Sequence, residues 1–222
     1  MKLFTFWSKS VERMKDEILI PSMIDGEYEL IDIETPNLCE SGVVDGEGFK
    51  QLSFDRLKSL AGIIRSEKDP FLHCDIDVQF LAPSKDVLME ELGDYDIAFM
   101  DDYGTACCGF HICRPSKKLA DFFDLCYETD GVNDQDALNK IIRTSDLRWK
   151  LLSGLFWNYG HHRRGIWVQY NWDSMDIPSD ILVHHANFTY GQDNKIAMAS
   201  RVRDRFCFLK NEQLQVSRSN GN

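Results

Sequence analysis

The segment from Phe71 to Pro83 reads FLHCDIDVQFLAP. Its first four residues form a short apolar run typical of a buried strand, and Asp75-Ile76-Asp77 follows directly. In an extended chain, residues i and i+2 point the same way, about 6.6 Å apart at roughly 3.3 Å per residue. The flanking apolar residues would bury these two acids at high cost unless a cation neutralised them. The segment therefore predicts a divalent-metal site at the end of a strand.

Strands and helices alternate around this segment. Strands are expected over residues 2–7, 27–33 and 97–100, and residues 106–113 can form one more. Helices are expected over 11–20 with a stop at Pro21, from a cap at Ser53, from 115 to 128 and over 136–143. This alternation is typical of an α/β sandwich with parallel strands, in which ligands bind beyond the carboxyl ends of the strands. The acidic pairs Asp75/Asp77 and Asp101/Asp102 both fall at such ends.

Composition and charge restrict the class of protein. The 222 residues are 43% hydrophobic and 27% charged, which is typical of one globular domain over 1–222. Lys plus Arg number 25 against 36 Asp plus Glu, so the net charge of -11 disfavours nucleic acid as a partner. No apolar stretch approaches the roughly 18 residues of a membrane helix, and residues 1–17 lack the apolar core of a signal peptide. We therefore expect a soluble, cytoplasmic protein without a membrane span.

The seven cysteines and the basic C-terminal segment each predict one further structural feature. Reduced, buried thiols are expected rather than a zinc site within Cys107–Cys113, because no second C-x-x-C pair exists to complete one. Residues 195–222 are basic, and their first part has the period of an amphipathic helix docked on the domain. Arg201, Arg203 and Arg205 within it can attract an anionic ligand to an otherwise acidic protein.

A second candidate group follows an apolar run near the C-terminus. Residues 183–191 read VHHANFTYG, and Lys195 stands four residues after the glycine. A histidine after a strand can add a nitrogen ligand to a carboxylate-held metal, and a lysine beyond a glycine suits a phosphate. Taken alone, His-His is more often structural. Its combination with the D-x-D favours the ligand interpretation.

A third group opens a helix at residues 133–139, NDQDALN. Asp and Asn at a helix start can cap it and complement its dipole, which explains one or two of these side chains. It does not explain five polar residues within seven positions. Polar side chains that orient sugar hydroxyls would have this pattern.

These groups, taken in order, resemble the nucleotide-diphospho-sugar transferase superfamily, the glycosyltransferases of GT-A fold. The features are the D-x-D, the C-C-G-F-H that begins at Cys107, the D-Q-D-x-L-N helix and H-A-N-x-x-x-G-x-x-x-K. The resemblance extends from Lys2 to Lys195 and implies a Rossmann-like, mixed but mostly parallel central sheet flanked by helices. It implies that Asp75 and Asp77 hold Mn²⁺ or Mg²⁺ against the donor diphosphate, with His185 as the third protein ligand.

The resemblance also implies residues around that metal. Lys195 would touch the diphosphate after the Gly191 turn, and Gly109 would line the sugar pocket. A basic residue of the preceding helix, Arg56 or Lys58, would meet the nucleotide. The segment Asp134, Gln135 and Asp136 would face the sugar or the acceptor as the catalytic group.

The sequence thus predicts a metal-dependent, hexosyltransferase-like glycosyltransferase. It would move a sugar from a UDP- or GDP-sugar donor to a hydroxyl acceptor such as a glycan. If configuration inverts, Asp134, Asp136 or Asp102 can serve as the base, whereas retention needs none and would place Gln135 beneath the sugar. Two alternatives remain at this point: an aspartate-nucleophile phosphatase, which also has a D-x-D after an apolar strand, and a nucleotide-sugar-binding protein without turnover.

Overall fold

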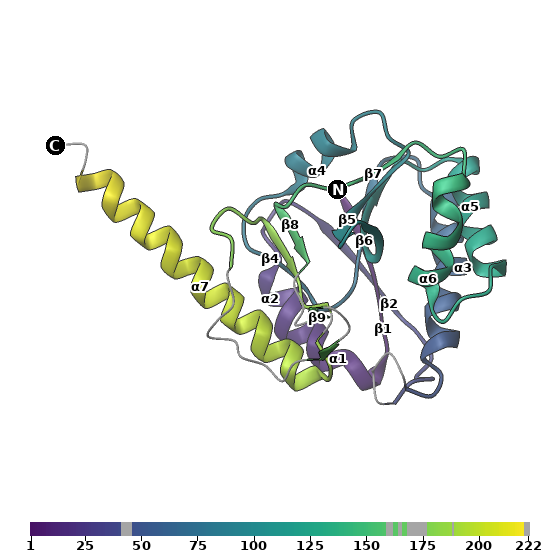
Figure 1. The fold of residues 1–222 in the computed structure, drawn as a ribbon, viewed down its shortest axis with the longest axis horizontal. Coiled ribbons are helices and arrows are strands. Elements are labelled where there is room, and N and C mark those ends of the chain that lie inside the picture. The colour runs from purple at the N-terminus through teal and green to yellow at the C-terminus, as the bar shows by residue number, and fades with distance from the viewer. Residues whose placement is uncertain (41–45, 159–161, 164–165, 168–176, 188, 220–222) are drawn as a thin grey trace.

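A mixed sheet forms the centre of the fold in the computed structural model, which describes residues 1–40, 46–158, 162–163, 166–167, 177–187 and 189–219 (Figure 1). Within these residues the sheet has six strands in the order β2-β1-β3-β6-β5-β7. They are β1 (Lys2–Trp7), β2 (Glu29–Glu34), β3 (Phe71–Cys74), β5 (Ile97–Asp102), β6 (Thr105–Cys113) and β7 (Trp149–Leu151). Neighbours are parallel except where β6 pairs with β3 and β5. The predicted mixed, mostly parallel sheet is confirmed.

Helices cover both faces of this sheet (Figure 1). One face carries α3 (Phe49–Ser66), α5 (Lys117–Glu128), α6 (Asp134–Ile141) and the 3-10 turn η3 (Ile142–Thr144). The other carries α4 (Lys85–Leu92) and a continuous helical segment made of η1 (Lys9–Val11), α1 (Glu12–Met14), η2 (Lys15–Leu19) and α2 (Ile20–Ser22). Each face closes its own apolar core. Leu57, Leu60 and Phe123 are fully buried in the first, and Ile18 and Leu88 lie buried in the second.

A second, three-stranded sheet lies beside the first and has the order β4-β11-β8. Its strands are β4 (Val78–Phe80), β8 (Phe156–Asn158) and β11 (Val183–His185). β11 is antiparallel to β4 and parallel to β8, which places His185 opposite Val78. Two short strands, β9 (His162–Arg163) and β10 (Ile166–Trp167), pair with each other. The small sheet therefore brings β11 next to the chain that leaves β3.

Two helices start earlier than predicted. α3 begins at Phe49, because Gly48 adopts a left-handed conformation with φ of 78° and turns the loop into the helix. Ser53 is therefore not the cap but lies inside the helix, where its hydroxyl donates to the carbonyl of Lys50 at 2.8 Å. α6 begins at Asp134 because Asn133 caps it, its side-chain oxygen accepting from a backbone N–H at 2.8 Å.

The first helical segment ends one residue beyond Pro21, at Ser22, rather than before the proline. Proline has no backbone N–H to donate to the preceding turn. The π-helical turn η2 directly precedes it, and such a wider turn accommodates the missing hydrogen bond. Among the cysteines, six are buried and free as predicted, whereas Cys207 is exposed on the last helix.

The last helix, α7 (Gln192–Ser219), begins against the body and its far half projects away from it (Figure 1). Among its side chains whose burial is described, Met198, Ala199, Val202 and Phe206 are buried, and Arg201, Arg203 and Arg205 are exposed. This division agrees with the predicted docked amphipathic helix. None of the helices in the described ranges combines the length and apolar character that crossing a bilayer requires.

Candidate functional site

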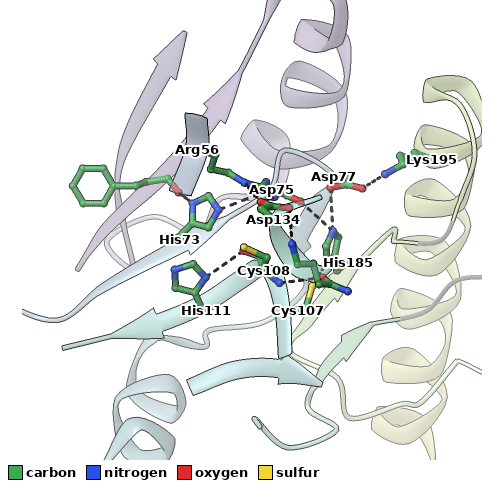
Figure 2. Close-up of polar contacts among 12 residues, drawn as sticks. Arg56, His73, Asp75, Asp77, Cys107, Cys108, His111, Asp134, His185 and Lys195 are labelled. Carbon is green, nitrogen blue, oxygen red and sulfur yellow. Dashed lines mark hydrogen bonds and ion pairs between the residues drawn. The ribbon is translucent and has the colours of Figure 1, made fainter. Parts of the chain in front are cut away.

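Asp75, Ile76 and Asp77 form a turn between β3 and β4. The backbone N–H of Val78 donates to the carbonyl of Asp75 at 3.3 Å, which closes the turn. The predicted extended conformation of the D-x-D is therefore wrong, because β4 leaves the central sheet to pair with β11. The predicted position at the end of an apolar strand is correct, and the turn still directs both carboxylates to one place (Figure 2).

That place is a cluster of Asp75, Asp77 and His185, with one ligand atom from each all within 4.8 Å of one another. Nε2 of His185 lies 3.2 Å from a carboxylate oxygen of Asp77 and 3.9 Å from one of Asp75 (Figure 2). Two hard carboxylate oxygens and an imidazole nitrogen suit Mn²⁺ and Mg²⁺ better than soft, thiolate-seeking ions. The residues thus fit a divalent cation, and the sequence identified all three.

Gly109 in β6 leaves space for the side chains of Asp75 and His185. A Cβ atom at this position would lie 2.3 Å from a carboxylate oxygen of Asp75 and 2.9 Å from Cε1 of His185. The backbone also holds the turn, because the N–H of Asp75 donates to the carbonyl of Gly109 at 2.7 Å. Only glycine lets β6 approach the carboxylate and the imidazole this closely.

Two basic side chains neutralise the carboxylates. Arg56 from α3 pairs with Asp75. Two of its nitrogens also contact Asp134 at the start of α6, and Nε lies 2.8 Å from a carboxylate oxygen of Asp134. Lys195 from the first turn of α7 pairs with Asp77 (Figure 2). The cluster therefore alternates acids and bases, and Asp134 joins it through the guanidinium of Arg56.

These charges shift the pKa values of the cluster in different directions. Burial raises the pKa of Asp75 and prevails over the opposing charge of Arg56. Burial also disfavours the charged form of Asp77, but Lys195 and His185 outweigh it and hold the pKa of Asp77 well below its usual range. Burial would lower the pKa of His185, yet the neighbouring carboxylate of Asp77 raises that pKa well above the ordinary value.

The start of α6 divides its polar residues among different partners. Gln135 accepts from the backbone N–H of Cys108 at 3.1 Å and donates to Asp102 at 2.5 Å. Asp136, in contrast, accepts from the N–H of Val132 and pairs with Lys140, each at 3.0 Å. The structure therefore joins Asp134 to the cluster through Arg56, holds Gln135 on Cys108 and Asp102, and gives Asp136 local helix-start contacts.

The remaining predicted residues are placed as follows. Lys58 lies with its ammonium group 5.5 Å from the ring centre of Tyr127, so Arg56 is the basic residue of α3 that contacts the cluster. Gly191 has a φ of 85° directly before α7, and its carbonyl accepts from the backbone N–H of Lys195 at 3.1 Å. Gly191 thus starts the helical turn that carries Lys195. His184 is the structural histidine of the pair, since its Nδ1 lies 2.8 Å from the side-chain amide of Gln79.

A pocket of about 170 Å³ adjoins the cluster. Asp75, Asp77, Arg56 and Lys195 form one side of it, and the rest is Phe6, Trp7, Ser8, Val11, Met14, Thr35, Cys39, Phe49, Leu52, Ser53 and Ile76. The sequence reasoning did not name this lining. A signal was present, because Trp7 ends β1 and Thr35 directly follows β2, and ligands bind beyond the carboxyl ends of parallel strands.

No family model and no curated protein matches the sequence. Solved structures do resemble the fold, among them the bifunctional glycosyltransferase WbbM (TM-score 0.60, 11% identity, 90% of this chain and 49% of that chain). Another is the glycosyltransferase GlyE of Streptococcus pneumoniae TIGR4, with a TM-score of 0.55 and 13% identity over 97% of this chain and 63% of that chain. A third is an active-site mutant of LgtC, with a TM-score of 0.53 and 14% identity over 96% of each chain. The chain thus spans about half of WbbM and less than two thirds of GlyE. Its fold is that of the GT-A glycosyltransferases, as the sequence resemblance implied.

Proposed function

We propose that the chain is a metal-dependent glycosyltransferase that moves a sugar from a UDP- or GDP-sugar to a hydroxyl acceptor. One observation carries the proposal: Asp75, Asp77 and His185 converge beside a pocket, with Arg56 and Lys195 in contact with the carboxylates. A nucleoside diphosphate needs these parts together, namely a cavity for the nucleoside, a divalent cation and fixed positive charge for the phosphates. The glycosyltransferase fold supports this function over an aspartate-nucleophile phosphatase.

The pocket supports a nucleoside as the part of the donor that it encloses. Phe6, Trp7 and Met14 offer apolar and aromatic surface to a base, while Ser8 and Thr35 offer hydroxyls. The indole Nε1–H of Trp7 is buried without a hydrogen-bond partner in the described structure. A buried donor of this kind favours a ligand with an acceptor oxygen, such as a base carbonyl or a ribose hydroxyl.

The charged side of the pocket suits the diphosphate. A bound Mn²⁺ or Mg²⁺ would supply positive charge where the leaving diphosphate becomes more negative. Asp75, Asp77 and His185 would hold it. Lys195 lies at the start of α7 within reach of the same place, so its ammonium group can pass from Asp77 to a phosphate oxygen. Arg56 would keep Asp75 oriented, and it connects the metal side of the site with Asp134.

The sugar would lie between the cluster and the start of α6. The three carboxylates that could act as a base are all engaged: Asp134 with Arg56, Asp136 with Lys140 and Asp102 with Gln135. A carboxylate has two oxygens and several lone pairs, so these contacts are compatible with transfer by inversion as well as by retention. Under retention, which needs no base, Gln135 would face the sugar, held by two hydrogen bonds.

A donor assay tests the proposal. The purified chain is incubated with UDP- and GDP-sugars, with Mn²⁺, Mg²⁺ or EDTA, and released nucleoside diphosphate is measured with and without acceptor sugars. We expect slow donor hydrolysis that requires the metal, and an Asp77→Asn variant about a hundredfold slower. Asp121→Asn is the matched control, since Asp121 pairs with Lys117 on the surface of α5.

Each possible outcome of this assay has a meaning. Undiminished hydrolysis in EDTA would contradict metal dependence. Binding of a donor that raises the melting temperature without any release of nucleotide would instead support the alternative of a binding protein without turnover.

A further inference from the structure

The sulfur of Cys107 lies 3.6 Å from Nδ1 of His185, the ring nitrogen that does not face the carboxylates (Figure 2). Cys107 is fully buried, and only 2% of the surface of His185 is exposed. The contact joins β6 to β11, two strands of different sheets. It is therefore fixed by the packing of the whole site rather than by local chain geometry.

The chemistry of a metal-bound histidine assigns a role to this sulfur. An imidazole binds a metal through the lone pair of one nitrogen and keeps its hydrogen on the other. Nε2 of His185 faces Asp75 and Asp77, so Nδ1 has to carry the hydrogen. The group that accepts this second hydrogen normally fixes the tautomer and the ring orientation of a metal ligand. We propose that Cys107 is this positioning residue, which rests on the metal site of the proposed function.

The backbone pairing of His185 and its contact with Gly109 limit the ring but do not choose between its two orientations. Its backbone is held on both sides, opposite Val78 in β4 and Asn158 in β8. Gly109 closes against the Cε1 edge of the ring. A ring rotated by half a turn would exchange Nε2 for Cε1 and direct a carbon towards the carboxylates. Such a rotation would lose the N–H···S contact with Cys107 as well as the contact of Nε2 with Asp77.

Another cysteine of the same strand provides a control for packing. Cys113 is also fully buried in β6, but it lies at the far end of the strand, opposite Phe71 and Ile97. Replacement of either cysteine by valine keeps an apolar side chain of similar size. Only the replacement of Cys107 removes an acceptor from His185.

The test measures Mn²⁺ binding to the full chain alone, by isothermal titration calorimetry. We expect Cys107→Val to bind Mn²⁺ about tenfold more weakly than the wild type, the lower end of the effect of removing such a partner. Cys107→Ser retains an acceptor and should stay closer to the wild type than to Cys107→Val. Cys113→Val should bind as the wild type does.

A second measurement does not depend on any variant. Nitrogen-15 NMR of the wild-type protein with Mg²⁺ should show the hydrogen of His185 on Nδ1. A hydrogen on Nε2, equal affinities of Cys107→Val and Cys113→Val, or a Cys107→Ser variant as weak as Cys107→Val would overturn the role of Cys107 and leave the metal site standing. A wild-type protein that binds no Mn²⁺ would overturn the metal site, and the role of Cys107 with it.

Discussion

Lys195 and Asp77, 118 residues apart in the sequence, form an ion pair that joins the first turn of α7 to the turn after β3. The same carboxylate belongs to the cluster of Asp75, Asp77 and His185, which we propose holds a divalent cation. In the protein alone the ammonium group would therefore compete with that cation for the carboxylate. A donor diphosphate would give the lysine a new anionic partner when the metal arrives.

Lys195→Ala should therefore separate metal binding from donor binding. We expect the affinity of the protein alone for Mn²⁺ to increase, because the competing charge is gone. The affinity for UDP or GDP in the presence of Mn²⁺ should fall about tenfold or more, the scale of one lost charge-assisted hydrogen bond. Calorimetry of each ligand measures both, with Lys118→Ala as the control, since Lys118 pairs with Asp96 outside the site. A loss of both affinities together would contradict the competition.

Asp77→Asn should destabilise the metal-free protein. Asp77 is almost fully buried and pairs with both Lys195 and His185, so the change leaves buried positive charge without its partner. We expect the free energy of unfolding to fall by about 2 kcal/mol. Urea denaturation in EDTA measures it against Asp121→Asn. An unchanged unfolding midpoint would mean that the ion pair contributes nothing to the fold.

The pH dependence of metal binding should follow His185. Its pKa in the folded, metal-free protein is raised above the ordinary 6.5 by Asp77, although burial acts in the opposite direction. The stability that this shift contributes is present below pH 6.5 and is lost as the pH rises through the folded pKa. A metal ligand must lose that proton, so the affinity for Mn²⁺ should rise with pH over the same range. Calorimetry in buffers of different ionisation enthalpy should detect proton release. Affinity that is independent of pH between 6 and 9 would contradict this.

Gly109→Ala should abolish most metal binding with the fold retained. Its Cβ would displace the carboxylate of Asp75 or the ring of His185, and we expect the affinity for Mn²⁺ to fall at least about tenfold. Gly62→Ala is the control, because a Cβ there meets nothing within 4 Å. In the middle of α3 that change should raise stability by about 0.5–1 kcal/mol. Circular dichroism and calorimetry of both variants check the prediction, and equal Mn²⁺ affinities would contradict it.

The exposed arginines of α7 should act by attracting anions. Replacing Arg201, Arg203 and Arg205 with glutamine should raise KM for the donor or an anionic acceptor at low ionic strength, with little change in kcat. The difference should shrink by about 0.5 M salt, where charges are screened within a few ångströms. Steady-state kinetics over a series of salt concentrations measures it. A KM equal to that of the wild type at every salt concentration, or an unfolded variant, would assign the helix a purely structural role.

The position of the candidate metal site could be predicted from the sequence, but the conformation of its central residues could not. A short apolar run before two aspartates indicates a strand end wherever it occurs. The turn at Asp75–Asp77, in contrast, depends on β4 pairing with β11, a strand more than a hundred residues later in the chain. No local pattern contains that partner. The local sequence favours an extended backbone at Asp75–Asp77, and the pairing of β4 with β11 imposes a turn there instead.

The choice between Arg56 and Lys58 has a similar explanation. The two residues flank the buried Leu57 on α3, so helical periodicity alone treats them alike. Arg56 is selected by its contact with Asp134, which lies 78 residues further along the chain. The pocket lining could not be predicted from the sequence for the same reason. Its side chains come from β1, the helical segment after β1 and α3, which only the tertiary fold brings together.

The distribution of the site along the chain has a consequence for its biosynthesis. Asp77 and His185 are 108 residues apart, and Lys195 comes later still, in the helix that ends the described chain. A nascent polypeptide emerges from the ribosome N-terminus first, so both aspartates are exposed to the cell long before the histidine is made. A truncated product that stops before β11 lacks His185 and cannot form the cluster of Asp75, Asp77 and His185. The proposed nucleotide-sugar site would therefore form only after β11 and α7 have been made and have joined the rest of the fold.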